Sequence, residues 1–508
     1  MNRSLRLLFT LLFLSNLTSQ VLKGQNDIDV LRYSQVGPYG DSRFMAMGGS
    51  FGALGANLSC MSYNPAGIAM YRNGEFDFTP GFRLQSTDAT HYGSTNTGST
   101  SKLDIANFGF VKSWDQNNPN PPNSSAYKKW NQRNAFGFNW NRLADFNFTT
   151  TIDGNGTNTS MINDFVSQAN ANGGNYPSNL NPIYEGLAYQ TGLIGTVTPS
   201  DSSHYLGWQL PNGPIHQTKT INESGYMREA ALSFAHAFSD QFYLGATIGF
   251  DKLNYTRNSV YQEAMPTSVG PGVTPYRGLE YDETLNTAGN GYNLKVGGIY
   301  RVSPSVRVGF YVHTPTLLHL TDNYQYTLTA TYDTVGAGPF TYSSSSQPGA
   351  YSYKVITPGR VGGSVAYIFN RLLATNVDLE YVNYSAMKLG TTDGTTAFNS
   401  TNSIIQSKYS GTMNIRAGAE LNIRPVILRV GYAGYGSPFG AVAVGQFVRS
   451  NFSAGVGFRG TSNWFFDMGL IYSHWSDNYY LYSAQFVKPT ALTNSIIYFT
   501  GTLGVKFK

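Results

Sequence analysis

The 508-residue sequence has few charged residues, one cysteine and no long apolar run beyond its N-terminus. Charged residues make up 12% of the chain, about half the share of a typical soluble globular protein. The single cysteine, Cys60, excludes an intrachain disulfide, and we expect a small buried side chain there. A membrane-spanning helix needs roughly 20 apolar residues in a row, so the chain past its N-terminus cannot cross a bilayer in that way.

The chain also lacks the usual signatures of enzymes and nucleic-acid-binding proteins. None of the seven histidines stands in a metal-ligand spacing such as HExxH. The net charge of +5 is spread along the chain and forms no basic cluster. We therefore expect no catalytic activity, no metal, no cofactor and no nucleic-acid partner.

The chain is instead rich in aromatic residues and glycine. Aromatics reach 14%, with 36 Tyr and 31 Phe, and there are 55 Gly, yet the mean hydropathy is −0.25. A disordered chain would lack the aromatics. A transmembrane β-barrel has such a composition, because lipid-facing apolar residues alternate with polar residues that face the lumen.

Apolar and polar residues alternate in segments from Gly74 to the C-terminus. About fourteen such segments predict an all-β fold, a transmembrane antiparallel β-barrel with an even number of strands. The last segment places its apolar residues on one face, at Ile497, Phe499, Leu503, Val505 and Phe507. The charged residues of the segments fall on the opposite face, as at Arg301, Arg307, Arg360, Asp378, Glu380, Arg416, Glu420, Arg429 and Asp467.

The connections between segments alternate in length, as they do in outer-membrane barrels. Tight turns are expected at 239–241, 303–305, 370–371, 424–425 and 460–463. Long polar extracellular loops are expected at 149–215 (the largest), 258–280, 316–347, 388–405, 436–448 and 482–491. Two features do not match regular barrel strands. Pro80 lies inside the first segment, and within 102–114 the apolar residues change from odd to even positions.

Residues 1–25 have the pattern of a secretory signal peptide. Arg3 and Arg6 precede a short apolar core from Leu7 to Leu14, and we expect cleavage near Gln25. The barrel of residues 74–508 would then lie in the cell outer membrane, with the surrounding lipid and the barrel-assembly machinery as partners.

Residues 26–73 do not alternate and are rich in glycine and small apolar residues. A free tail of this kind would expose a large apolar surface. A barrel of about fourteen strands has a lumen too wide for its own side chains to fill. We therefore predict that residues 26–73 fold into the lumen as a plug, or hatch.

Several short motifs carry a family resemblance. The plug contains Met47-Gly-Gly-Ser-Phe-Gly-Ala-Leu-Gly55 and Asn64-Pro65-Ala66, and the barrel contains Gly291-Tyr-Asn-Leu-Lys-Val-Gly297 and Leu428-Arg-Val-Gly-Tyr432. In this order they resemble the hatch, with its NPA motif, and the wall of the FadL/OmpP1/TodX family of outer-membrane hydrocarbon transporters, in a Bacteroidetes-type member. The resemblance implies a fourteen-stranded barrel with an N-terminal hatch. It also implies passive uptake of long-chain fatty acids or similar hydrophobic molecules, captured by the extracellular loops and released past the N-terminal hatch, either laterally through the wall or into the periplasm.

Three sets of candidate site residues follow. Apolar residues of the largest loop could capture a ligand outside the barrel, or could simply pack their own loop: Leu187, Tyr189 and Leu193. Inward-pointing arginines could hold a ligand carboxylate, or could pair with acids across strands and with the plug: Arg142, Arg360 and Arg416. Hatch residues could form a hinge or gate: Gly48, Gly49, Asn64, Pro65 and Ala66.

Two other functions stay open at this point. A general porin for polar solutes would share the barrel but would not need a plug. A type IX secretion-associated barrel would carry cargo proteins in place of lipids. We expect a monomer whose substrate is a hydrophobic small molecule.

Overall fold

The structure is a computed structural model that describes residues 25–115, 132–171, 174–198, 200–208, 210, 214–265, 276–334, 338–392, 394, 397–439, 447–460 and 463–507. The signal peptide expected in residues 1–25 therefore lies almost wholly outside the described residues. The expected turn at 460–463 includes residues 461 and 462, which also lie outside them.

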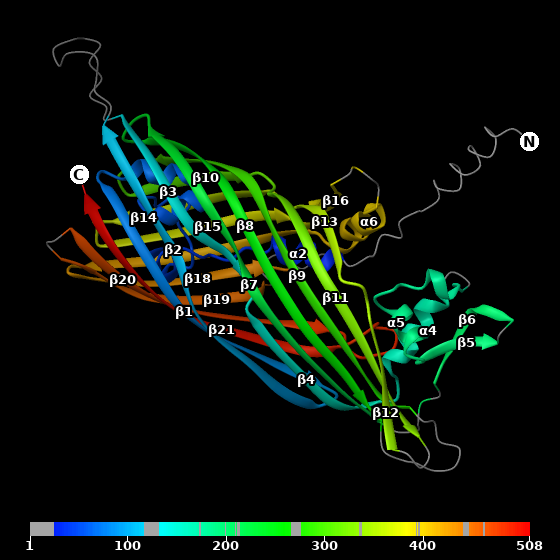
Figure 1. Ribbon diagram of the computed structural model, residues 1–508. Helices are drawn as coiled ribbons and strands as arrows, with labels where there is room; N and C mark the ends of the chain where they lie inside the picture. Colours follow the sequence, from blue (N-terminus) through cyan, green and yellow to red (C-terminus); the bar gives the residue numbers. More distant parts are fainter. Residues whose placement is uncertain are drawn as a thin grey trace, which may run out of the picture.

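One antiparallel sheet closes on itself to form the barrel (Figure 1). Strands β1 (Gly74–His91) and β21 (Thr490–Phe507) close the ring, with Gly74 opposite Phe507. Some barrel strands are divided into more than one segment. Counted as whole strands, the segments of this sheet make up a barrel of fourteen strands, as expected. The other segments are β2 (Ser94–Asp115), β3 (Arg133–Asp145), β4 (Phe148–Thr157), β7 (Ile215–Ala237), β8 (Phe242–Ala264), β9 (Tyr276–Arg301), β10 (Val306–His313), β11 (Leu317–Thr334), β12 (Gly338–Ser345), β13 (Gly349–Ile356), β14 (Arg360–Phe369), β15 (Leu373–Asn383), β16 (Lys388–Thr391), β17 (Gly411–Ile423), β18 (Val426–Gly436), β19 (Phe447–Arg459) and β20 (Trp464–Tyr479).

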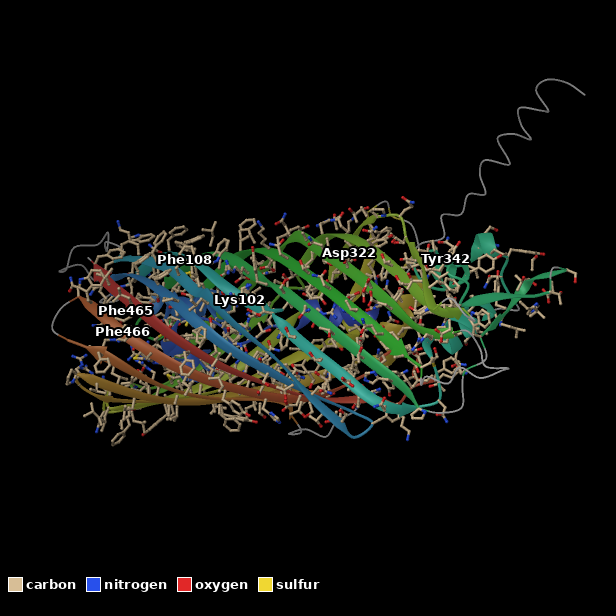
Figure 2. All side chains as sticks on the ribbon, turned by 60° about the horizontal axis from the view of Figure 1, so that its bottom comes forward. Lys102, Phe108, Asp322, Tyr342, Phe465 and Phe466 are labelled. Carbon is tan, nitrogen blue, oxygen red and sulfur yellow. The ribbon has the colours of Figure 1, made fainter. Side chains whose placement is uncertain are left out.

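Successive side chains point to opposite faces of the wall, as the alternation predicts. Phe465 is 8% exposed and faces the lumen, whereas its neighbour Phe466 is 39% exposed and faces outward (Figure 2). Acidic and basic residues predicted to face the lumen are indeed buried there, among them Asp378, Glu380, Arg416, Arg429 and Asp467. The outer face therefore carries the apolar band that a membrane-embedded barrel requires.

A β-bulge explains both irregularities of the first two segments. Thr79 pairs with Asn107 and Pro80 with Ile105, so Ala106 is the extra residue of β2. The bulge shifts the side-chain phase, and Leu103 and Phe110 both face outward although one position is odd and the other even. Pro80, which cannot donate to a ladder, lies where the pairing is already disrupted.

The expected loop boundaries were wrong on one side of the barrel. β8 and β9 extend to Ala264 and from Tyr276, and residues 317–334 and 338–345, expected in a loop, form β11 and β12. From Phe242 to Phe250 the outward-facing residues of β8 are apolar. Beyond Phe250, toward the lid end of the barrel, Lys252 is exposed and Leu253 is buried inside. The apolar face therefore changes sides where the strand leaves the membrane.

A small lid lies at the end of the barrel opposite the C-terminus (Figure 1). It comprises α4 (Met161–Ala169), η4 (Pro177–Asn179), α5 (Glu185–Gln190) and a hairpin of β5 (Ile194–Thr198) and β6 (Asp201–Gly207). The first element of the lid is the helix α4. Ser160 caps it by accepting a hydrogen bond from the amide of Ile162.

The segment before β1 lies inside the barrel. It contains α2 (Asp27–Ser34), α3 (Ser42–Ala46), η1 (Leu58–Ser62) and η2 (Pro65–Met70), each started by an Asn or Asp side chain that caps its first amides. A further helix, α6 (Asn399–Lys408), and η5 (Tyr384–Ala386) lie between wall strands. Among the described residues, no helix is long and apolar enough to cross a membrane.

Candidate functional site

The hatch sits on glycines of the wall. A Cβ atom built on any of these glycines would come within 2.6 Å of a hatch atom, so the hatch backbone lies directly against the wall. The series runs through six strands: Gly245, Gly297, Gly309, Gly418, Gly431 and Gly455. Gly48 of the hatch faces Tyr432 in the same way and has a φ of 65°. Gly49 has a φ of 74° and packs on Pro38.

Asn64, Pro65 and Ala66 form the start of η2 and are fully buried or nearly so. The Asn64 amide donates to Gly52 O at 2.6 Å and to Gly298 O at 3.2 Å, while its oxygen accepts from Ala66 N at 3.2 Å. One side chain therefore joins the hatch to itself and to β9.

Charged pairs lock the hatch to the wall on the other side. The Arg43 guanidinium binds both oxygens of Glu420, at 2.8 and 3.0 Å. Arg429 also binds Glu420, at 2.6 Å, and reaches Asp467 at 2.7 Å. Because buried charges are costly unless they are paired, this network fixes the position of α3.

The lumen beyond residues 38–73 of the hatch is apolar, and the first hatch helix, α2, occupies it. Val30, Leu31 and Tyr33 of α2 are buried in a cluster with lumen-facing side chains of the wall, including Leu253, Leu318, Leu320, Val355 and Val382. We call this region the apolar chamber. The end of α2 is held by Asp27, whose carboxylate accepts from Lys408 at 2.6 Å and from Tyr409 at 2.7 Å.

A polar cavity of about 60 Å³ lies at the foot of the apolar chamber. Arg360 and Arg416 line it, and both bind Glu380, at 3.1 and 3.3 Å. Lys295 pairs with Glu229 in the same cavity. Such a volume takes a few water molecules, so a long ligand needs the side chains around the cavity, or α2, to move.

The barrel wall is interrupted between β2 and β4. Residues 107–115 of β2 pair with β3, but residues 94–106 have β1 as their one ladder partner among the described strands, and β4 pairs with β7. Side chains bridge the gap instead: Thr100 to Thr149 at 2.9 Å, and Lys102 to Asn147 at 3.1 Å. We call this gap the wall break.

The chain between β3 and β4 turns into the lumen at the wall break. Leu143 is the extra residue of a bulge in β3. Phe146 points inward and packs edge-on against Tyr33 of α2, with 6.0 Å between the two ring centres. Arg142 lies here too, paired with Asp145 and, at 2.5 Å, with Asp104. Asp145 also pairs with Arg83 of β1. The wall break thus touches the apolar chamber on the inside.

The predicted site residues are not all brought together. Leu187 and Leu193 are fully buried in the core of the lid, and Tyr189 is 37% exposed and packs edge-on against Tyr205. Arg360 and Arg416 share the polar cavity, whereas Arg142 lies at the wall break. All three arginines are ion-paired, so a ligand carboxylate would compete with an acid at each of them.

One enzyme-like spacing is present after all, because residues 48–52, Gly-Gly-Ser-Phe-Gly, match the Gly-x-Ser-x-Gly spacing of a hydrolase nucleophile. The Ser50 hydroxyl donates to Arg416 O at 3.3 Å and accepts from the Asn376 amide at 2.7 Å. Ser50 is fully buried. Bound in this way, with no histidine among its hydrogen-bond partners in the described residues, the serine is structural.

Sequence reasoning missed the wall glycines and the wall break. The glycines fall at lumen-facing positions of successive strands, which is a readable pattern once the hatch is known to touch them. The wall break left a weaker mark, namely the phase change within 102–114. Its other side, at residues 146–147, carries no pattern that distinguishes it from a continuous strand.

No protein-family model and no curated protein matches the sequence. Solved structures do match it. The crystal structure of a Pseudomonas aeruginosa FadL homologue is similar with a TM-score of 0.54 at 12% identity, over 94% of this chain and 100% of that chain. A deletion mutant (deltaS2) of the TodX monoaromatic hydrocarbon channel gives a TM-score of 0.51 at 12% identity, over 93% and 100%. The chain therefore has the fold of FadL-type outer-membrane channels.

Proposed function

We propose that this protein is a passive outer-membrane channel for small hydrophobic molecules, long-chain fatty acids among them. The observation that carries the proposal is the apolar chamber, which is filled by α2 and adjoins the wall break through Phe146. An apolar ligand gains about 0.8 kcal/mol for each buried CH₂, so a dry chamber attracts it and a water-filled pore does not.

The ligand leaves through the wall break and does not pass the hatch. The hatch backbone is in contact with six wall strands and its charged groups are paired, so its removal would expose buried charges. The wall break is closed by side chains that can separate without breaking a backbone ladder. In this proposal α2 yields to the ligand, and the NPA segment stays in place as a fixed support.

The two other functions differ in what they require of the lumen. A general porin needs a water-filled path, whereas the hatch and α2 occupy the lumen here. A type IX secretion role requires a bound protein, which co-purification from native membranes would show.

Uptake by whole cells tests the proposal. The full chain would be expressed in a Gram-negative host that lacks its own fatty-acid channel, and uptake of labelled dodecanoate, toluene and maltose would be measured. We expect faster uptake of dodecanoate or toluene and unchanged uptake of maltose. Equal gains for all three solutes would show a porin, and no gain for either hydrophobic solute would refute the proposal.

A pair of variants then tests the apolar chamber itself. Leu253→Asn puts a polar group into the chamber, and Lys252→Asn changes the next residue, which faces outward. We expect L253N to slow hydrophobic uptake several-fold and K252N to leave it unchanged, because burying an unpaired amide costs about 1–3 kcal/mol.

A further inference from the structure

A second, smaller cavity lies between the hatch and the wall, away from the polar cavity described above. Pro38, Tyr39 and Met45 of the hatch cover it. Its wall is formed by four adjacent strands, which contribute Arg83, Arg449, Asn451, Ile471, Ser473, Ile496 and Tyr498. These residues are in register: Arg83 pairs with Tyr498, and Asn451 pairs with Ser473. The cavity therefore has a continuous floor.

Two guanidinium groups reach this cavity with hydrogen-bonding capacity to spare. Arg83 is 2% exposed, and its Nη1 has no hydrogen-bond partner among the described residues. Arg449 is half-buried and makes no ion pair within the described part of the chain, and its Nε is buried without a partner there. Its guanidinium lies 4.6 Å from the Trp475 ring centre. A buried donor without a partner is costly, so each of these groups calls for an acceptor.

The rest of the cavity is apolar and leads to the wall break. Met45, Ile471 and Ile496 belong to one buried cluster, against which Phe148 and Trp475 pack. Phe148 begins β4, and its ring meets that of Trp475 edge-on at 5.9 Å. An apolar chain whose head lies at the two arginines would thus run along this cluster toward the gap between β2 and β4.

We propose that this cavity binds the carboxylate head of a single-chain amphiphile, with Arg83 and Arg449 as its ligands. Guanidinium groups bind carboxylates with two parallel hydrogen bonds, and a neutral alcohol gives no such partner. The cavity measures about 20 Å³, room for about one water-sized group, so the hatch side chains that cover it must shift to admit the carboxylate. This proposal rests on the proposed uptake of hydrophobic molecules. It adds a binding site that selects carboxylates and lies beside the wall break.

Binding of dodecanoate and of dodecanol to the purified full-length barrel at pH 8 tests the assignment. We compare the wild type with Arg449→Gln and with a control, Arg371→Gln, which removes an exposed charge in a turn. R449Q should weaken dodecanoate binding about tenfold and leave dodecanol binding unchanged, because a charged hydrogen bond is lost. R371Q should change neither.

Equal dodecanoate affinity in R449Q and wild type would overturn the carboxylate site while leaving the proposed function intact. Equal losses for dodecanoate and dodecanol would also overturn it, since the arginine would then support packing alone. If the wild type binds neither compound, both the site and the proposed function fail.

A second measurement keeps the wild-type arginines. 2-Bromododecanoate carries a fluorescence quencher beside its carboxylate, and Trp475 lies beneath Arg449. We expect this compound to quench the tryptophan fluorescence of the wild type and to quench Trp475→Phe much less. Unchanged quenching in W475F would place the head elsewhere and contradict the proposal.

Discussion

Asn64 of the hatch and Gly297 of the wall lie so close together that a Cβ atom on Gly297 would come within 2.0 Å of Asn64 Oδ1. In register opposite Gly297 stands Gly245, where a Cβ would meet Pro65 at 2.5 Å. The NPA segment therefore rests on a glycine pair contributed by β8 and β9. The NPA segment can approach the wall this closely because neither Gly245 nor Gly297 carries a Cβ atom.

Gly297→Ala should accordingly loosen the hatch. Overpacking a tight contact costs about 1–3 kcal/mol, and we expect a lower unfolding temperature of the purified barrel in detergent, followed by heat-modified gel mobility. Gly363→Ala is the matched control, because that strand glycine has no atom within 4 Å of an added Cβ. Equal effects of the two variants would show that the strand, and not the hatch contact, is responsible.

The ion pairs at the wall break predict a larger effect. Asp145→Asn removes the shared partner of Arg83 and Arg142, which leaves the buried Arg83 without its acid and Arg142 with Asp104 alone. Breaking a buried pair costs about 3–5 kcal/mol. Asp115→Asn breaks the more exposed pair with Arg133 and should cost less than about 1 kcal/mol. Urea unfolding of the two variants measures the difference, and similar losses would rule out a special role for the wall break.

The tether of α2 predicts a pH dependence. Burial raises the pKa of Asp27, but the hydrogen bonds from Lys408 and Tyr409 outweigh it and lower the pKa below 3.8. A lowered pKa stabilises the docked helix fully above the ordinary value, and this contribution is lost as the pH falls through the lowered one. Hydrogen exchange of the α2 amides should thus be uniformly slow, after correction for intrinsic rates, between about pH 5 and 8.

Asp27→Asn is the companion variant for that measurement. It should exchange faster than the wild type near neutral pH and converge with it in strong acid, where the wild-type carboxylate is protonated. A wild type that loses protection already between about pH 7 and 5 would contradict the assigned direction.

The barrel itself could be predicted from the sequence because each strand inside the membrane has one apolar and one polar face. The prediction failed above the membrane for the same reason. Beyond Phe250 the outer face of β8 meets water and the inner face meets the apolar chamber, so Lys252 points outward and Leu253 inward. A reversed alternation looks like the end of a strand, so the sequence predicts a loop at 316–347 where the structure has β11 and β12.

The candidate site was harder to predict, because it depends on which lumen residues meet the hatch. Parity correctly placed Arg360 and Arg416 inside the barrel. It could not show that both share Glu380, since their partners come from distant positions in the chain. For Leu187 and Leu193 the sequence leaves ligand capture and loop packing open, because an apolar stretch in a loop serves either purpose, and in the structure both pack the lid.

Exit through the wall break is the central claim, and a cross-link across it is its most direct test. Thr100 and Thr149 face each other across the gap, with their hydroxyls 2.9 Å apart, and can be replaced by a cysteine pair. Ser233 and Thr247, whose hydroxyls are 2.6 Å apart across the intact β7–β8 ladder, form the matched control pair. Oxidation of T100C/T149C should stop dodecanoate uptake and reduction should restore it, while S233C/T247C transports in both states. Undiminished uptake by fully cross-linked T100C/T149C would contradict the account.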